Sequence, residues 1–278
     1  MQLALKNNTF DMKNVLLFIQ FEFKRLLFTK SGLFILSTLF IVCFFILNFI
    51  IAESVELIRN PLIREKMSIW FQQIQLDHLL YWPYPELAVF WMIGLFFIPF
   101  LCILLTSDQI ASDLQRGTLR FLLLRSTRTE LLFGRFLGKT LIVMLLTLLA
   151  LVATLTMSIY RDPNQLTHSI GHVFIVFSNL FVLSLPYIAL MCLLNILFKS
   201  AKISVLFVAV MLPLLSIIID YFTENWALIG SLQYALPGYQ SMDAIQVQQL
   251  SLYATVLPLC QTFCYLLLAQ QILARKSL

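Results

Sequence analysis

Six long apolar segments, separated by shorter polar ones, dominate the pattern of this 278-residue chain. Each is about 20 residues or longer, the length that an α-helix needs to cross the hydrocarbon core of a bilayer. None carries Asp, Glu, Lys or Arg near its centre. The pattern predicts an all-α integral membrane protein with one transmembrane domain over residues 1–278. Its spans are expected near residues 33–52, 87–106, 136–159, 171–198, 203–222 and 250–273.

The composition supports a membrane protein. Hydrophobic residues make up 60% of the chain and charged residues 12%, whereas soluble domains are about a quarter charged. The five cysteines (Cys43, Cys102, Cys192, Cys260 and Cys264) all fall in predicted spans without a metal-binding spacing, and we expect them to pack as small hydrophobes.

The distribution of basic residues predicts the orientation. An even number of spans puts both termini on one side, and the segments on that side are 1–32, 107–139, 199–202 and 275–276. They hold five, six, two and two Lys or Arg, which is 15 of the 19 in the chain, while the opposite segments hold four. This asymmetry places both termini in the cytoplasm. The basic residues behind the net charge of +5 set the orientation and contact anionic lipid headgroups, so the charge does not require a nucleic-acid partner.

Two further elements are expected at the membrane surface. Residues 13–30 predict an amphipathic helix lying in the inner interface, with aromatic side chains buried and its charged residues, Glu22, Lys24 and Arg25, toward the headgroups. Residues 61–80 can form a second interfacial helix on the outer side. A short re-entrant element near 225–236, before span six, is also expected and requires surrounding protein.

Polar groups inside the spans are few. Asn48, Asn179 and Asn195 are candidates for interhelical hydrogen bonds or for contacts to a transported substrate. Prolines inside four spans favour kinks: Pro99, Pro186, Pro213 and Pro258. His168 and His172 have the spacing of metal ligands on one helix face, but no third ligand is near them in the sequence, so interfacial histidines are the favoured interpretation.

No catalytic, metal or cofactor motif is found. The stretch Gly134-Arg-Phe-Leu-Gly138-Lys139 superficially suggests a phosphate-binding loop, but it has three residues between the glycines where four are needed, and no strand precedes it. These glycines more simply allow close helix packing. If the function consumes energy, another chain must supply it.

The charged stretch between spans two and three resembles the corresponding segment of ABC-2 type transporter permeases. The resemblance rests on an acidic residue, Gly-Thr-Leu, a leucine pair, an arginine and Gly-Lys before span three, here Asp113, Gly117-Thr118-Leu119, Leu122-Leu123, Arg128 and Gly138-Lys139. Glu22 also resembles the acidic residue in the N-terminal interfacial helix of that family. The chain departs from the family pattern at Ser126, where proline is common, and at Asp113, where glutamate is common.

The resemblance implies a permease subunit that pairs with a cytoplasmic ABC ATPase, which binds ATP and Mg while this chain binds no cofactor. It also implies a second permease copy (a homodimer or a related permease), export, and a multi-pass place in the bacterial inner membrane. Residues 108–130 would form the coupling segment that docks into the ATPase. Its expected contact residues are Asp108, Asp113, Leu114, Arg116, Gly117, Thr118, Leu119 and Arg120.

Three other functions stay open from the sequence. A secondary carrier or channel works without an ATPase, but it normally carries an ionisable residue at membrane depth. A membrane-embedded enzyme or assembly factor requires a cluster of catalytic or polar residues. A force-transmitting complex within the same family would have larger outer segments than this chain has.

Overall fold

The computed structural model describes residues 11–73, 77–80, 82, 84–108, 110–161, 166–223, 230–239 and 252–276, and this part of the chain is helical with no strand. Six helical stretches are long and apolar enough to cross a membrane, in agreement with the predicted spans. They are α2 (Lys30–Phe45) continued by η1 (Ile46–Ile51) and α3 (Ala52–Arg59), then α6 (Pro85–Thr106), α9 (Arg128–Arg161), α10 (Leu166–Phe198), α11 (Ala201–Thr223) and α14 (Leu252–Arg275).

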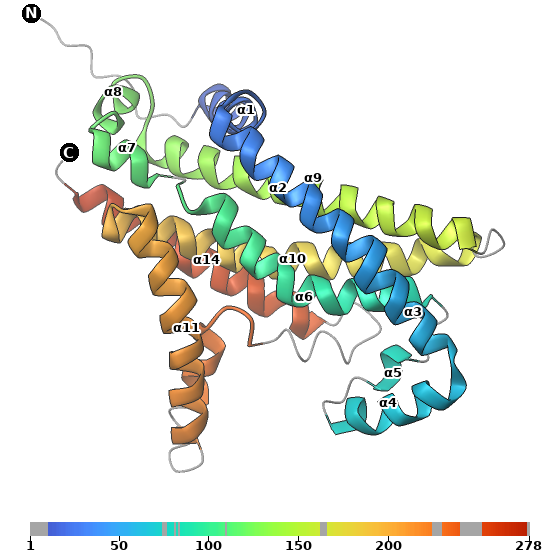
Figure 1. The fold of residues 1–278 in the computed structure, drawn as a ribbon. Coiled ribbons are helices and arrows are strands. Elements are labelled where there is room, and N and C mark those ends of the chain that lie inside the picture. The colour runs from blue at the N-terminus through green and yellow to red at the C-terminus, as the bar shows by residue number, and fades with distance from the viewer. Residues whose placement is uncertain are drawn as a thin grey trace, which may run out of the picture.

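Four of these helices, α6, α9, α10 and α14, form the central bundle (Figure 1). Helix α10 contacts the other three, and 78% of its most apolar window is buried, against 6% for the first span and 17% for α11. All three sequences are apolar on every side, so periodicity alone does not distinguish them. Exposed apolar faces on the first span and α11 suit lipid or a neighbouring subunit, because lipid is as apolar as the side chains.

Both ends of the described chain lie at one end of this bundle, which we call the terminal end (Figure 1). Helix α1 (Met12–Phe28) packs along α9 there, with α7 (Ala111–Arg116) and α8 (Leu119–Leu123) nearby. Asp11 caps α1 by accepting a hydrogen bond from the Lys13 amide. Thr29 ends α1 and caps α2, so the chain turns there from the first helix into the first span.

Several boundaries differ from the sequence prediction. The first helical stretch continues to Arg59, beyond the apolar run, through a π-helical turn at Ile46–Ile51. Glu53 and Glu56 favour helix, so the helix extends past the end of the hydrophobic segment. The four span prolines all lie inside continuous helices, and none of the four helices ends at its proline.

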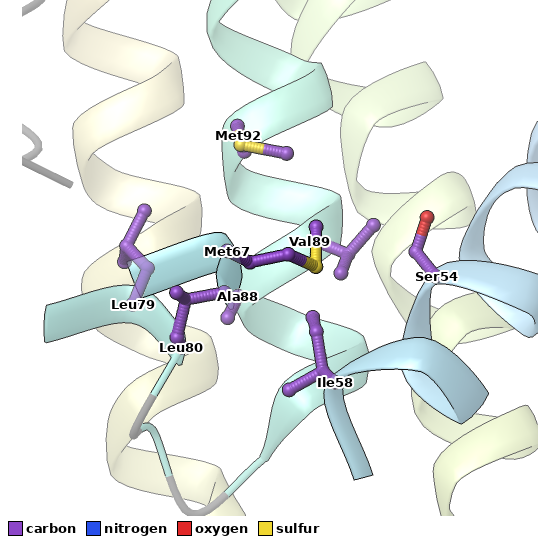
Figure 2. Close-up of a pocket in the computed structure, with 8 residues that line it drawn as sticks. All are labelled: Ser54, Ile58, Met67, Leu79, Leu80, Ala88, Val89 and Met92. Atoms are coloured by element: carbon purple, nitrogen blue, oxygen red, sulfur yellow. The ribbon is translucent and has the colours of Figure 1, made fainter. Parts of the chain in front are cut away.

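At the opposite end of the bundle, α4 (Pro61–Gln73) contacts α3 and α5, and α5 (Asp77–Leu80) contacts α6. That residues 61–80 lie in the outer membrane interface stays a prediction. Figure 2 shows the small cavity between these helices, about 50 Å³, in which Met67, Leu79 and Leu80 face Ala88 and Val89 of α6. Its lining is apolar apart from Ser54. The cavity is therefore a packing gap between α3, α4, α5 and α6.

The segment before α14 contains the short 3-10 helix η3 (Ser231–Ala235), which lies beside α11. Residues 225–229, which were also expected to belong to a re-entrant element, lie outside the described part. The Tyr187 hydroxyl donates to the Pro237 carbonyl (3.2 Å), and Gln261 Nε2 donates to the carbonyls of Tyr234 (2.7 Å) and Leu236 (3.0 Å). Protein donors thus satisfy backbone that could not face lipid; its membrane depth stays a prediction.

Candidate functional site

The predicted coupling segment folds as two short helices joined by a tight turn. Gly117 ends α7 in the left-handed conformation (φ +70°), as glycine commonly does after a helix. The Thr118 hydroxyl then donates to Asp113 Oδ1 (2.9 Å), which closes the turn. Ile110 and Leu119 are buried against the end of the bundle. The sequence therefore fixes the shape of this segment locally and anchors it by its apolar side chains.

Arg135 of α9 is the electrostatic centre of the terminal end. Its Nη1 lies 3.2 Å from Glu22 Oε1 in α1, and its Nη2 contacts the Asp113 carboxylate in α7. Lys139, one helical turn further along α9, places its Nζ 3.0 Å from Glu22 Oε2. Glu22 is fully buried and Arg135 nearly so. Charges buried in this way are tolerated only when they are paired, so α1, α7 and α9 are held in one arrangement.

A second ion pair links the start of the segment to α1. Arg25 Nη2 contacts the Asp108 carboxylate, and Arg25 Nη1 donates to the Asp108 carbonyl (3.1 Å). The other carboxylate oxygen of Asp108 accepts from the Ser112 amide (3.1 Å). Together with the Arg135–Asp113 pair, this connection ties the residues before α7 and the middle of α7 to α1 and α9.

Glu130 and Arg128 organise the start of α9. The Glu130 carboxylate accepts hydrogen bonds from the Thr127 amide (3.0 Å), the Asp11 amide (2.9 Å) and Asn14 Nδ2 (2.9 Å). Arg128 Nη1 donates to the carbonyls of Ala274 (2.8 Å) and Lys276 (3.0 Å), so it satisfies the end of α14. Beyond α14, burial and then the nearby Lys199 charge lower the pKa of Lys276.

The exposed face of the segment is basic and apolar. Arg116 and Arg120 are exposed, and Phe121 and Leu124 leave 72% and 75% of their surface uncovered. Of the two leucines expected to contact a partner, Leu119 is buried in this chain and Leu114 packs against the same cluster. Asp108 and Asp113 are engaged in ion pairs within the chain.

The other predicted site residues fall into separate places. Glu22 faces α9, while Lys24 on the same helix is exposed. Asn195 Nδ2 donates to the Thr106 carbonyl (2.9 Å) and links α10 to α6, as expected for an interhelical hydrogen bond. Asn179 is buried in α10. Asn48 is exposed on the first span and donates to Phe44 of its own helix. The structure does not bring the three asparagines into one site.

The opposite end holds a second charged group that sequence reasoning missed. Glu86, at the start of α6, is buried, and its Oε1 lies 3.7 Å from Arg59 Nη2 and 3.6 Å from Arg161 Nη1. His172 stacks edge-on against Trp82 and Tyr84 nearby. The side chain of His168 lies outside the described part. Within that part, no group of three metal-ligating side chains is found.

Comparison with known families gives one result. A family model described as ABC-2 family transporter protein matches residues 19–277, nearly the whole chain. A comparison with curated proteins found no match. The matched region includes all six spans, the segment at 108–130 and the Glu22–Arg135 pair.

Proposed function

The chain belongs to the ABC-2 family of transporter proteins, and we propose that it is the membrane permease subunit of an ATP-driven exporter. The family implies association with an ABC ATPase. In this proposal the ATPase is a separate cytoplasmic chain that binds ATP and Mg, and two permease copies form the pathway in a bacterial inner membrane. This chain carries no catalytic step.

The observation that carries the proposal is the attachment of the segment 108–130. It presents Arg116, Arg120, Phe121 and Leu124 outward, while Asp113 is ion-paired with Arg135 of α9. Apolar side chains supply contact area to a partner groove, and basic ones favour complementary charge and fix the register. The Asp113–Arg135 pair then connects that surface to a membrane-spanning helix.

The mechanism follows from this connection. When ATP closes the ATPase subunits, the segment moves with the surface on which it docks. Since Arg135 and Arg25 tie α7 to α9 and α1, these helices shift together as a rigid body, and the packing along the bundle changes. The access of the pathway changes with it, and cargo leaves on the outer side.

The cargo follows from what the described spans carry. The ion pairs within them involve Arg135 and Lys139, toward the terminal end of α9, and Arg59, Glu86 and Arg161 at the opposite helix ends. A carrier driven by protons or ions normally needs an ionisable group at mid-depth. The arrangement favours an amphiphilic or hydrophobic cargo over a small ion, and an ATPase over an ion gradient.

The test is charge reversal on the exposed face. Arg120→Glu combined with Phe121→Asp should abolish co-purification with the ATPase and stop ATP-dependent transport in liposomes. The matched control is Lys66→Glu, an exposed charge reversal on α4 at the opposite end, which should leave both unchanged. ATP-independent transport by the chain alone, or full ATPase association of the double variant, would refute the proposal.

A further inference from the structure

A cavity of about 100 Å³ opens where α1 turns into the first span. Apolar side chains, among them Ile35 of α2 and Leu105 of α6, line part of it. Arg25, Lys139, Asp108 and Ser31 also line it. A lining that combines apolar and charged side chains suits an amphiphile, which has an anionic headgroup and an apolar chain.

Arg25 and Lys139 carry more N–H donors than their carboxylate partners use, so they can also bind an anion. A guanidinium has five N–H groups and an ammonium has three. The hydrogen bonds of Arg25 to Asp108 use two of its five. Lys139, a residue that is 7% exposed, places its Nζ 3.0 Å from Glu22 Oε2. Arg25 is paired with Asp108 and Lys139 with Glu22. A phosphate would therefore bind through the N–H groups of the two cations beyond those that hold these carboxylates.

The position of the cavity favours a lipid. It lies at the terminal end, beside the first span, whose apolar surface is almost entirely exposed. The segments of this end also hold most of the basic residues of the chain. Basic pockets between membrane helices on such a face are suited to phospholipid headgroups, and the exposed side of α2 can receive the acyl chains.

We propose that this cavity binds the phosphate headgroup of an anionic phospholipid from the adjoining leaflet, through Arg25, Lys139 and Ser31. Because Arg25 also holds Asp108, the bound headgroup shares the side chain that anchors the start of the segment 108–130. The lipid therefore sets how firmly that segment is attached to α1. Binding itself needs only this chain, so the proposal stands or falls separately from the association with an ATPase.

In the experiment, phosphatidylglycerol is titrated into the purified full chain in a neutral detergent. Bound lipid is counted by native mass spectrometry, and the midpoint of thermal unfolding is measured separately. Phosphatidylglycerol should bind in preference to phosphatidylcholine. Arg25→Gln should weaken it about five-fold, since one basic group near a membrane surface contributes about that factor. Ser31→Phe, which leaves every charge in place but adds bulk to the lining, should weaken it as well.

The control is Lys30→Gln, an exposed basic residue at the same end that does not line the cavity; it should bind the lipid like the unaltered chain. Equal weakening by Lys30→Gln and Arg25→Gln would show diffuse attraction and overturn the site. Unchanged binding in Ser31→Phe would also overturn it. Complete competition by soluble glycerol phosphate would assign the cavity to a free phosphate compound and overturn the lipid proposal.

Discussion

The guanidinium of Arg135 in α9 is ion-paired with the carboxylate of Asp113 in α7, although Asp113 belongs to the segment expected to face a partner protein. The same guanidinium reaches Glu22 of α1. The acidic residue of this segment therefore acts on the partner surface indirectly, by holding its shape and its attachment to the membrane helix.

Replacing Arg135 or Asp113 should destabilise the chain. The loss should depend on how deeply the charge that loses its partner is buried. Arg135→Gln leaves the fully buried Glu22 with Lys139 alone, and we expect a loss of about 3–5 kcal/mol. Asp113→Asn should cost about 1.5–3 kcal/mol, because Asp113 is partly exposed. Denaturant unfolding in detergent measures both values.

A double-mutant cycle separates this explanation from a general loss of packing. The variant carrying both Asp113→Asn and Arg135→Gln should lose less stability than the sum of the two single losses. In the double variant neither charge of this pair remains, so their interaction is lost only once. Strict additivity would show that the two side chains do not stabilise each other.

Gly117 provides a test of the turn between α7 and α8. A Cβ there would meet nothing within 4 Å, yet φ is +70°, so the cost of Gly117→Ala is in the backbone, about 1–2 kcal/mol. Gly117→Asn should cost less, since asparagine tolerates this conformation. Thermal unfolding should rank glycine above asparagine and asparagine above alanine. An alanine variant as stable as the unaltered chain would contradict the left-handed turn.

The six spans, the segment between spans two and three and the packing role of Gly134 and Gly138 could be predicted from the sequence. Each depends on composition or spacing over a short stretch. The partners of Arg135 could not, because Glu22 lies 113 residues away and side-chain pairing depends on how α1 crosses α9. The burial of Leu119 could not be predicted either, because a five-residue helix such as α8 is too short for periodicity to show which side is buried.

Gly134 in α9 and Gly171 in α10 are both helical glycines, but the space around them differs, so they serve as test and control. A Cβ on Gly134 would lie 2.6 Å from Phe18 Cβ in α1, whereas a Cβ on Gly171 would meet nothing within 4 Å. Gly134→Ala should therefore push α1 from α9 and cost about 1–3 kcal/mol, while Gly171→Ala should be neutral or slightly stabilising. Thermal midpoints of both variants check this, and equal midpoints would rule out the close contact between α1 and α9.

Gly238 and Tyr187 test the segment that precedes α14. Gly238 has φ +96°, and a Cβ there would lie 2.2 Å from the Tyr187 hydroxyl, which donates to the Pro237 carbonyl. Gly238→Ala should destabilise the chain through both the backbone conformation and this overlap. Tyr187→Phe alone should cost about 0.5–1.5 kcal/mol for the lost hydrogen bond. In the Tyr187→Phe background, Gly238→Ala should cost less than in the unaltered chain, because the next atom, Tyr187 Cζ, is 3.4 Å away. Unfolding free energies of the four proteins give the coupling, and a coupling of zero would place residue 238 away from α10.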